Sequence, residues 1–296
     1  MRHWVCKFKV SSWHRQILKH GYKFRFIHKK PVSPCHKHDS LKGCPNIPAL
    51  LDCVNDLSQK GVIIETECNS KEFCNRLFLV PKASGDWRPI LNVKRLNHYI
   101  IKEKFKMERI QDVLLMLEPD DFLITIDLTD AYLAAPIAKS MQRFCTFRIA
   151  EQHYRFTRVC FGLTSAPYLF TKLLKVGHLF ILILFKKFKQ NIYLFIYLLQ
   201  PVVAYFRQKG VRLLIYMDDL LIIAETCNKA RQQAASIKSS FKQLGFIISE
   251  KSMTAPSTVA QFLGVVLNTG AMSVGLPEDK IAKINLIAQQ LLSKSK

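Results

Sequence analysis

The sequence predicts an α+β fold, and two hairpins and one helix lead to that prediction. The first hairpin joins apolar residues 77–80 to residues 87–91 through the Ala-Ser-Gly-Asp turn at 83–86. The second joins the apolar runs 211–216 and 220–224. Because a tight turn reverses the chain, each hairpin implies an antiparallel pair of strands.

The predicted helix follows a Phe-Gly-Leu turn at residues 161–163. Thr164 or Ser165 can cap its first turn, Pro167 suits that turn, and about two turns follow. Gly162 would let a base pair approach the backbone closely. Taken alone, this stretch is only the start of a helix.

The charge of the chain indicates a polyanionic partner. Its 296 residues include 44 Lys and Arg against 22 Asp and Glu, a formal net charge of +22. Nucleic acid or an anionic membrane surface would suit such an excess. We expect no membrane span, since lysines at 186, 187 and 189 divide the most apolar region, residues 179–199.

Residues 1–44 form a basic N-terminal leader, whose first 40 residues hold ten Lys or Arg and one acid. Its aromatic residues could stack on bases while the cations contact phosphates, or the leader could be poorly ordered. These aromatic residues are Trp4, Trp13, Tyr22, Phe24 and Phe26.

The nine cysteines indicate an intracellular protein with reduced thiols. Their number is odd, no Cys-x-x-Cys occurs, and no cleavable signal peptide is present.

Three carboxylates can carry metal chemistry. Asp127 follows the short apolar run 122–126, while Asp218 and Asp219 occupy a predicted hairpin tip, where two like charges repel each other. If the strands are neighbours, the three acids would converge and bind Mg²⁺, which prefers oxygen ligands. Two such ions could stabilise both the attacking and the leaving oxygen of a phosphoryl transfer. Singly, each acid is also compatible with an ordinary strand end.

Two cations flank the first hairpin. Lys82 and Arg88 could hold a triphosphate, Arg as a fork and Lys as a point charge. A hairpin with solvated charges is the simpler interpretation of this stretch alone.

Taken in order, these stretches resemble a reverse transcriptase over about residues 45–270. "IDLTDAY", "FGLTSAP" and "YMDD" resemble its palm motifs, and "LGFIISEKS" and "QFLGVVL" resemble the two that follow. "ILKHGYKFRF", "DWRPILNVKRLN" and "PVVAYFRQKGVRLL" resemble DIRS-type retroelements, which integrate with a tyrosine recombinase. Long-terminal-repeat elements of the Ty/gypsy kind are the alternative.

The resemblance implies a right-hand polymerase with fingers, palm and partial thumb, and an antiparallel palm sheet backed by helices. Fingers would span about 45–120, palm about 121–270 and the start of a thumb about 271–296. An atypical insertion, residues 176–200, interrupts the domain, and its apolar and lysine-rich composition suggests a translated intron. A lineage-specific loop is the other interpretation.

The resemblance also assigns roles to residues. Metal ligands would be Asp127, Asp218 and Asp219, with the Leu128 carbonyl as a further ligand, for two Mg²⁺ ions or Mn²⁺ in their place. Lys251 would lie near the pyrophosphate leaving group, and Tyr132 would be the steric gate under the sugar. The remaining nucleotide-binding residues would be Lys82, Arg88, Asp130, Ala131, Phe161 and Gly162.

The function implied is RNA-directed DNA polymerase activity, with an RNA or DNA template, a primer and deoxynucleoside triphosphates as partners. Ribonuclease H and recombinase would be separate or missing. Two alternatives remain: a degenerate, inactive retroelement remnant, and a basic nucleic-acid-binding protein without chemistry. Tyr132 disfavours an RNA-dependent RNA polymerase, because its ring should exclude a 2′-hydroxyl.

Overall fold

The structure, a computed structural model, describes residues 12–33, 39–67, 71–81, 85–174 and 201–294. The chain forms two compact units. Unit 1 combines residues 1–105 with 130–176, and unit 2 combines residues 106–129 with 177–296. Both units are therefore discontinuous in sequence.

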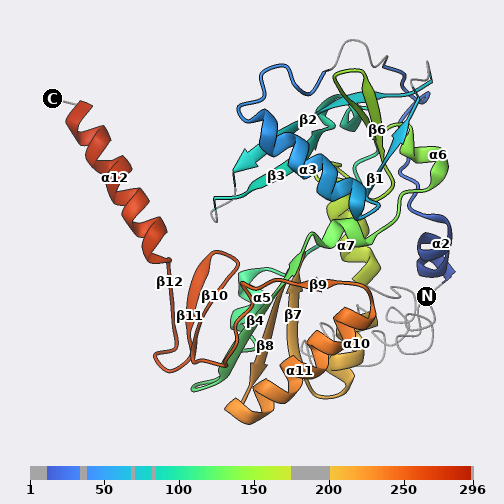
Figure 1. Cartoon of the computed structure of the whole chain (residues 1–296). Coiled ribbons are helices and arrows are strands. Elements are labelled where there is room, and N and C mark those ends of the chain that lie inside the picture. The colour runs from blue at the N-terminus through green and yellow to red at the C-terminus, as the bar shows by residue number, and fades with distance from the viewer. Residues whose placement is uncertain (1–11, 34–38, 68–70, 82–84, 175–200, 295–296) are drawn as a thin grey trace. The chain divides into compact units, whose positions relative to one another are not determined.

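Unit 1 is built on a five-stranded sheet in the order β1-β6-β5-β2-β3 (Figure 1). Only the β2–β5 pair is parallel. The predicted first hairpin is confirmed, since β2 and β3 pair from Arg76–Asn92 to Pro81–Trp87. The strands are β1 (Ile63–Thr66), β2 (Cys74–Pro81), β3 (Trp87–Asn92), β5 (Thr146–Ile149) and β6 (Gln152–Phe156).

Helices pack around this sheet, and α3 contacts β1 and β3. Asn46 caps α3 by accepting a hydrogen bond from the Ala49 N–H at 3.0 Å. The predicted helix after Gly162 is confirmed as α7, with Pro167 in its first turn. The helices are α2 (Ser12–His20), α3 (Ile47–Gln59), α4 (Lys94–Asn97), η2 (Ala131–Ala134), α6 (Lys139–Gln142) and α7 (Ala166–Leu174).

The N-terminal segment belongs to the core of unit 1. Ile17, Tyr22 and Phe24 are buried in the same apolar cluster as Leu50 and Phe147. Tyr22 and Phe24 are therefore not presented for stacking on bases. Trp4 lies outside the described residues.

Unit 2 contains an antiparallel four-stranded sheet in the order β7-β8-β4-β9 (Figure 1). Its strands are rich in Leu and Ile, and the residues between Leu220 and Ala224 are all buried. Helix α10 packs on β7, and α11 packs on β4, β8 and β9. These elements are α5 (Ile110–Leu114), β4 (Phe122–Thr129), α10 (Pro201–Gln208), β7 (Arg212–Tyr216), β8 (Asp219–Ala224), α11 (Cys227–Gln243) and β9 (Ile247–Ile248).

A smaller sheet, β10-β11-β12, and helix α12 complete unit 2. The apolar side chains of α12 are exposed, with Leu291 at 65% and Leu292 at 69%. The elements are β10 (Val259–Phe262), β11 (Val265–Asn268), β12 (Ser273–Gly275) and α12 (Glu278–Lys294).

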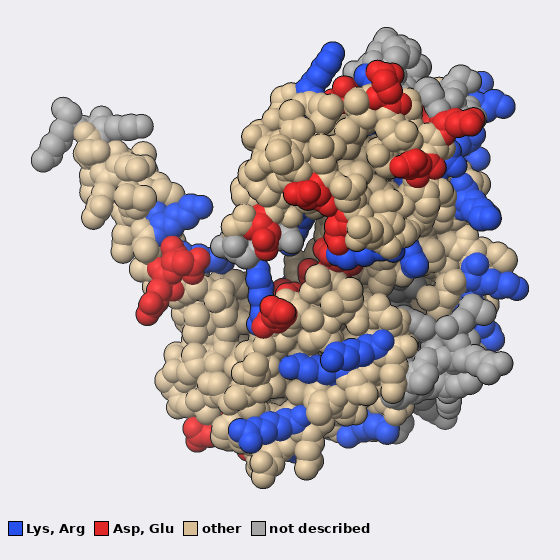
Figure 2. Space-filling view, viewed as in Figure 1, with Lys and Arg blue, Asp and Glu red and all other residues tan. Residues whose placement is uncertain are grey.

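Exposed Lys and Arg side chains are distributed over both units (Figure 2). Among the described residues, no helix is long and apolar enough to cross a membrane. Among the described cysteines, Cys44, Cys74, Cys145, Cys160 and Cys227 carry free thiols. The insertion at 176–200 lies outside the described residues.

Candidate active site

Two of the three predicted metal ligands face each other across the sheet of unit 2. Asp127 of β4 is in register with Asp219 of β8, and the Leu128 N–H donates a hydrogen bond to the Asp218 carbonyl at 2.9 Å. The antiparallel pairing of β4 and β8 thus brings the acids at 127, 218 and 219 onto adjacent backbone positions. We expected β4 to end before Asp127, which was wrong. The strand continues to Thr129 because its last residues also pair with β9.

The turn between β7 and β8 also differs by one residue from the expected acidic pair. Met217 and Asp218 form the turn, and Asp219 is the first residue of β8, paired with Tyr216. Met217 has a φ of +53°, a left-handed backbone that a side chain other than glycine rarely adopts. The β-pairing of Asp219 fixes it within the sheet, whereas Asp218 lies on the connection.

Electrostatics distinguish the acids. Burial raises the pKa of Asp219 from 3.8 to about 6, with further contributions from the neighbouring Asp218 and Asp127 carboxylates. Negative charge is thus concentrated where it is only partly solvated. A divalent cation would offset this repulsion, so the chemistry of the donor set fits Mg²⁺ or Mn²⁺. Among the described residues, no group of three or more acidic, His or Cys side chains is arranged closely enough to hold a metal ion.

A serine that the sequence did not single out holds the backbone of Asp127. The buried Ser252 hydroxyl accepts a hydrogen bond from the Asp127 N–H at 3.0 Å and lies 3.3 Å from the Asp127 carbonyl. The Ser249 N–H donates to the same carbonyl at 2.8 Å. Lys251 lies between these serines in sequence and is exposed. The motif "LGFIISEKS" contains both serines, but only its contacts show their role.

Unit 1 carries the predicted nucleotide-binding residues. Asp130 has a left-handed φ of +50° and precedes the short helix η2, which carries Tyr132 and the buried Ala131. The Tyr132 ring lies edge-on to Phe161, with ring centroids 5.5 Å apart. The Arg88 guanidinium carbon lies 5.5 Å from the centroid of the same Phe161 ring. Lys82 lies outside the described residues.

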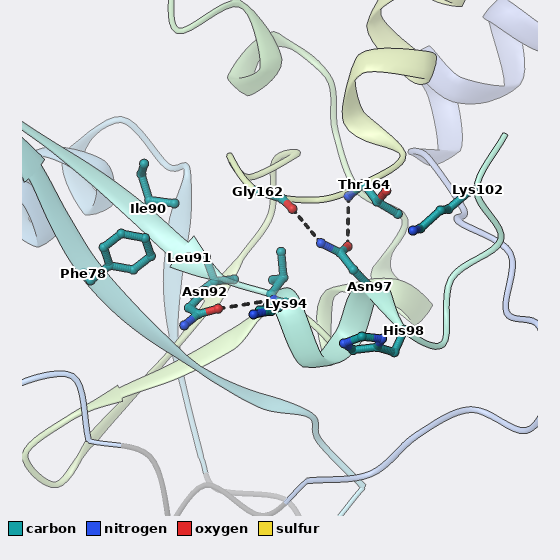
Figure 3. A pocket seen from close by; sticks show the side chains of 11 residues that line it. Phe78, Ile90, Leu91, Asn92, Lys94, Asn97, His98, Lys102, Gly162 and Thr164 are labelled. Carbon is teal, nitrogen blue, oxygen red and sulfur yellow. Dashed lines mark hydrogen bonds between the residues drawn. The ribbon is translucent and has the colours of Figure 1, made fainter. Parts of the chain in front are cut away.

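Gly162 occupies a position that only glycine fits. Its φ is +96°, and a Cβ atom there would lie 2.8 Å from the Leu91 carbonyl oxygen. The Asn97 side chain holds the loop from both sides, donating to the Gly162 carbonyl at 2.8 Å and accepting from the Thr164 N–H at 2.9 Å (Figure 3). This arrangement connects β3, α4 and the loop before α7.

A pocket of about 370 Å³ lies beside this loop (Figure 3). Leu91, Val93 and Ile90 contribute apolar surface, while Lys94 and Lys102 bring positive charge. Sequence reasoning missed these lysines and Asn97, although "DWRPILNVKRLN" includes two of them. The run Ile-Leu-Asn-Val-Lys at residues 90–94, three apolar residues with one polar and one basic residue among them, is the signal that could have located the pocket.

Comparison with known proteins identifies the family. Residues 80–267 match the family model described as "Reverse transcriptase (RNA-dependent DNA polymerase)", and the chain belongs to this family. It is a reverse transcriptase domain of the retroelement and retrovirus type.

The relatives include viral and transposon polyproteins. The chain is 24% identical over 251 residues to the genome polyprotein of Petunia vein clearing virus (isolate Hohn), covering 82% of the chain and 10% of the polyprotein. It is 24% identical over 280 residues to the Pro-Pol polyprotein of Feline foamy virus, covering 93% and 21% respectively. A Pol polyprotein from transposon 412 of Drosophila melanogaster is 27% identical over 124 residues, covering 40% of the chain and 10% of that polyprotein. The chain thus spans a small part of these relatives.

Solved structures confirm the fold. The foamy viral protease-reverse transcriptase dRH in complex with double-stranded DNA matches with a TM-score of 0.64 at 19% identity, covering 96% of this chain and 48% of that one. The same protein with an RNA/DNA hybrid matches with a TM-score of 0.62 at 19% identity, covering 96% and 36%. The predicted α+β right-hand polymerase fold is confirmed.

Proposed function

We propose that this chain is an active RNA-directed DNA polymerase. The primer 3′-hydroxyl oxygen would form a bond to the α-phosphorus of a deoxynucleoside triphosphate, and the bond to the pyrophosphate leaving group would break. The observation that supports the proposal is the pairing of Asp127 on β4 with Asp219 on β8, next to Asp218 in the β7–β8 turn.

Asp127, Asp218 and Asp219 would hold two Mg²⁺ ions, or Mn²⁺, with the Leu128 carbonyl as a further ligand. When bound, the metal ions would supply charge stabilisation for the attacking and leaving oxygens. Ser252 and Ser249 hold the backbone of Asp127 through their hydrogen bonds. Lys251 would donate to the departing pyrophosphate.

The nucleotide would bind to residues of unit 1. Lys82 and Arg88 would contact the triphosphate, together with the backbone at Asp130 and Ala131. Tyr132 would lie under the sugar, next to Phe161 and Gly162.

An RNA or DNA template paired with a primer would be the polyanionic partner. The net charge of +22 and the lysines of the pocket beside Gly162 support this assignment. The foamy viral relative has been solved with double-stranded DNA and with an RNA/DNA hybrid. We assign fingers to about 45–120, palm to about 121–270 and the start of a thumb to about 271–296. The free thiols support an intracellular protein.

Within the family, we propose an origin in a DIRS-type element, on the three sequence segments quoted above. The DNA flanking the gene tests this origin. A tyrosine recombinase reading frame in the same element is the expected result, and an integrase of the Ty/gypsy kind in its place contradicts it.

Primer extension tests the polymerase function. The purified chain should extend a DNA primer on an RNA template in Mg²⁺, and Asp218→Asn should abolish extension while leaving template binding intact. Glu151→Gln removes an exposed carboxylate outside the site and serves as the control. Template binding without extension by the parent chain would favour an inactive remnant.

A further inference from the structure

We propose that helix α2 positions α7, and through α7 the Tyr132 ring, so that the N-terminal segment helps to select deoxyribonucleotides over ribonucleotides. The selection itself rests on the function proposed above. We call the contacts by which α2 holds α7 the α2 brace. They lie within unit 1 and join residues of α2 to Lys172, more than 150 positions later in sequence.

The first contact is a hydrogen bond from α2 to the backbone of α7. His14 is 2% exposed, and its Nε2 lies 3.0 Å from the Lys172 carbonyl oxygen. Since a carbonyl only accepts, Nε2 carries the proton and donates. Lys172 lies in α7, so this hydrogen bond joins the two helices. His14 therefore ties α2 to the backbone of α7, 158 positions later in the sequence.

The second contact fixes the side chain of the same residue. The Lys172 ammonium lies 4.6 Å from the centroid of the Trp13 ring and donates a hydrogen bond to the Tyr168 hydroxyl at 2.8 Å. A cation over an indole face is attracted by the ring quadrupole. Backbone and side chain of Lys172 are thus both held by neighbouring residues of α2.

The chain after α2 is anchored as well, which keeps the helix from sliding. The Tyr22 N–H donates to the Pro136 carbonyl at 2.7 Å, and the Ala138 N–H donates to the Tyr22 carbonyl at 3.0 Å. Gly21 has a φ of +80°, and a Cβ atom there would lie 2.4 Å from the Ala138 nitrogen. This close approach leaves one position for the segment.

Helix α7 transmits its position to the nucleotide pocket through Phe170. This buried ring lies edge-on to Tyr132, with centroids 5.5 Å apart and planes at 74°. Tyr132 thus packs between Phe170 of α7 and Phe161. A steric gate depends on the ring position to a fraction of an ångström, so a small shift of α7 would relax the selection without removing any group that touches substrate.

The test compares variants by the ratio of kcat/KM for a deoxynucleotide to kcat/KM for the matching ribonucleotide. His14→Leu should lower this ratio about fivefold, equivalent to about 1 kcal/mol. His14→Gln should restore it, because the amide nitrogen can donate to the same carbonyl. Lys172→Met, which removes the ammonium but keeps the carbonyl, provides a second and milder disruption.

Two controls separate positioning from general loss of stability. Gln16→Ala alters an exposed residue of α2, and Val54→Ala creates a small cavity in α3 within the same core. Neither should change the ratio, although Val54→Ala should lower the melting temperature. An unchanged ratio in both His14→Leu and Lys172→Met overturns the proposal. So does an effect of His14→Leu that persists in full when Tyr132→Val is already present.

Hydrogen exchange provides a readout that does not need activity. Amides of α7 should lose protection in His14→Leu and keep it in His14→Gln and Gln16→Ala. Unchanged protection in His14→Leu would overturn the proposal that α2 positions α7. A parent chain that extends no primer would instead contradict the proposed polymerase function, while the exchange measurement would still test whether α2 positions α7.

Discussion

Asp127 and Asp219 lie directly opposite each other on the antiparallel strands β4 and β8, two carboxylates held in register by the backbone of the sheet. The position of Asp219 has a free-energy cost in the metal-free chain, because burial and the neighbouring negative charges disfavour its ionisation. The site is thus arranged for a cation at the expense of stability without one.

Asp219→Asn should stabilise the metal-free chain at neutral pH. The folded-state pKa of Asp219, about 6, exceeds its ordinary value of 3.8, so the folded protein binds more protons between these values. Stability is therefore highest below pH 4 as far as this group is concerned, and falls as the pH rises towards 6. After allowance for solvent screening, the loss should be about 1–2 kcal/mol.

Thermal unfolding in a chelator, at pH values from 4 to 8, measures this effect as the difference between parent and variant. The stability difference between variant and parent should grow from pH 4 to about pH 6 and stay constant from there to pH 8. Glu151→Gln, whose carboxylate is exposed, should show no such trend. A variant that is less stable than the parent at pH 8 would contradict the electrostatic account.

Gly162→Ala should destabilise the chain more than Gly61→Ala. Both glycines have a positive φ, but a Cβ atom at Gly61 meets nothing within 4 Å, whereas one at Gly162 meets the Leu91 carbonyl. We expect a cost of about 1 kcal/mol at Gly61 and at least about 2–3 kcal/mol at Gly162. Urea unfolding measures the loss of unfolding free energy in each of the two variants. Equal losses would contradict the prediction and show that the Leu91 carbonyl can move away without cost.

Glu108→Ala should cost about 3–5 kcal/mol, because it removes the carboxylate that neutralises the buried Arg207 guanidinium. Glu108 accepts from Arg207 at 2.8 Å and from the Ile215 N–H at 2.8 Å, and the Arg207 side chain is 1% exposed. The matched control is Asp56→Ala, whose partner Lys60 is half exposed, with an expected cost below about 1 kcal/mol. Similar midpoints for the two variants in urea would contradict this ranking.

Tyr132→Val should admit ribonucleotides, because the smaller side chain leaves room for a 2′-hydroxyl. We expect the relative use of ribonucleotides to rise at least about tenfold. Tyr154→Val removes a ring that stacks on Phe147 in the same unit and should leave the selection unchanged. Equal selection in parent and Tyr132→Val would reject Tyr132 as the gate.

Deleting residues 176–200 should raise soluble yield and activity. The prediction comes from sequence alone, since the apolar runs 179–185 and 192–199 promote aggregation when exposed. Expression of both forms, followed by melting and primer extension, tests it. A deletion form that is less soluble and extends no better would show that the segment is a working part of the protein.

Local patterns predicted the elements well where turns and helix caps dominate. The hairpin around 81–87, the metal hairpin and α7 all follow from residue types within a short window. The order of motifs also predicted the family and the fold. Two strand boundaries were predicted incorrectly: β8 begins one residue earlier than expected, at Asp219, and β4 ends three residues later than expected, at Thr129. Pairing with strands distant in sequence sets both boundaries.

Long-range contacts could not be predicted from the sequence. Nothing near Ser252 indicates that its hydroxyl will meet the backbone of Asp127, 125 residues earlier. The basic charge of the leader suggested a flexible arm, yet Tyr22 and Phe24 are buried in the core. Such contacts depend on how elements pack rather than on the propensity of any segment.

The interleaving of the two units has a consequence for synthesis on the ribosome. Unit 1 cannot complete its fold until residues 130–176 have been synthesised, because Tyr22 pairs with Ile137 and His14 contacts Lys172. Strand β4 of unit 2 emerges between the two halves of unit 1, about ninety residues before its partner β8. The early chain must therefore hold an apolar strand without its neighbour while translation continues. A cut anywhere in the chain would leave at least one unit incomplete, so we expect no single break to yield two fragments that fold alone.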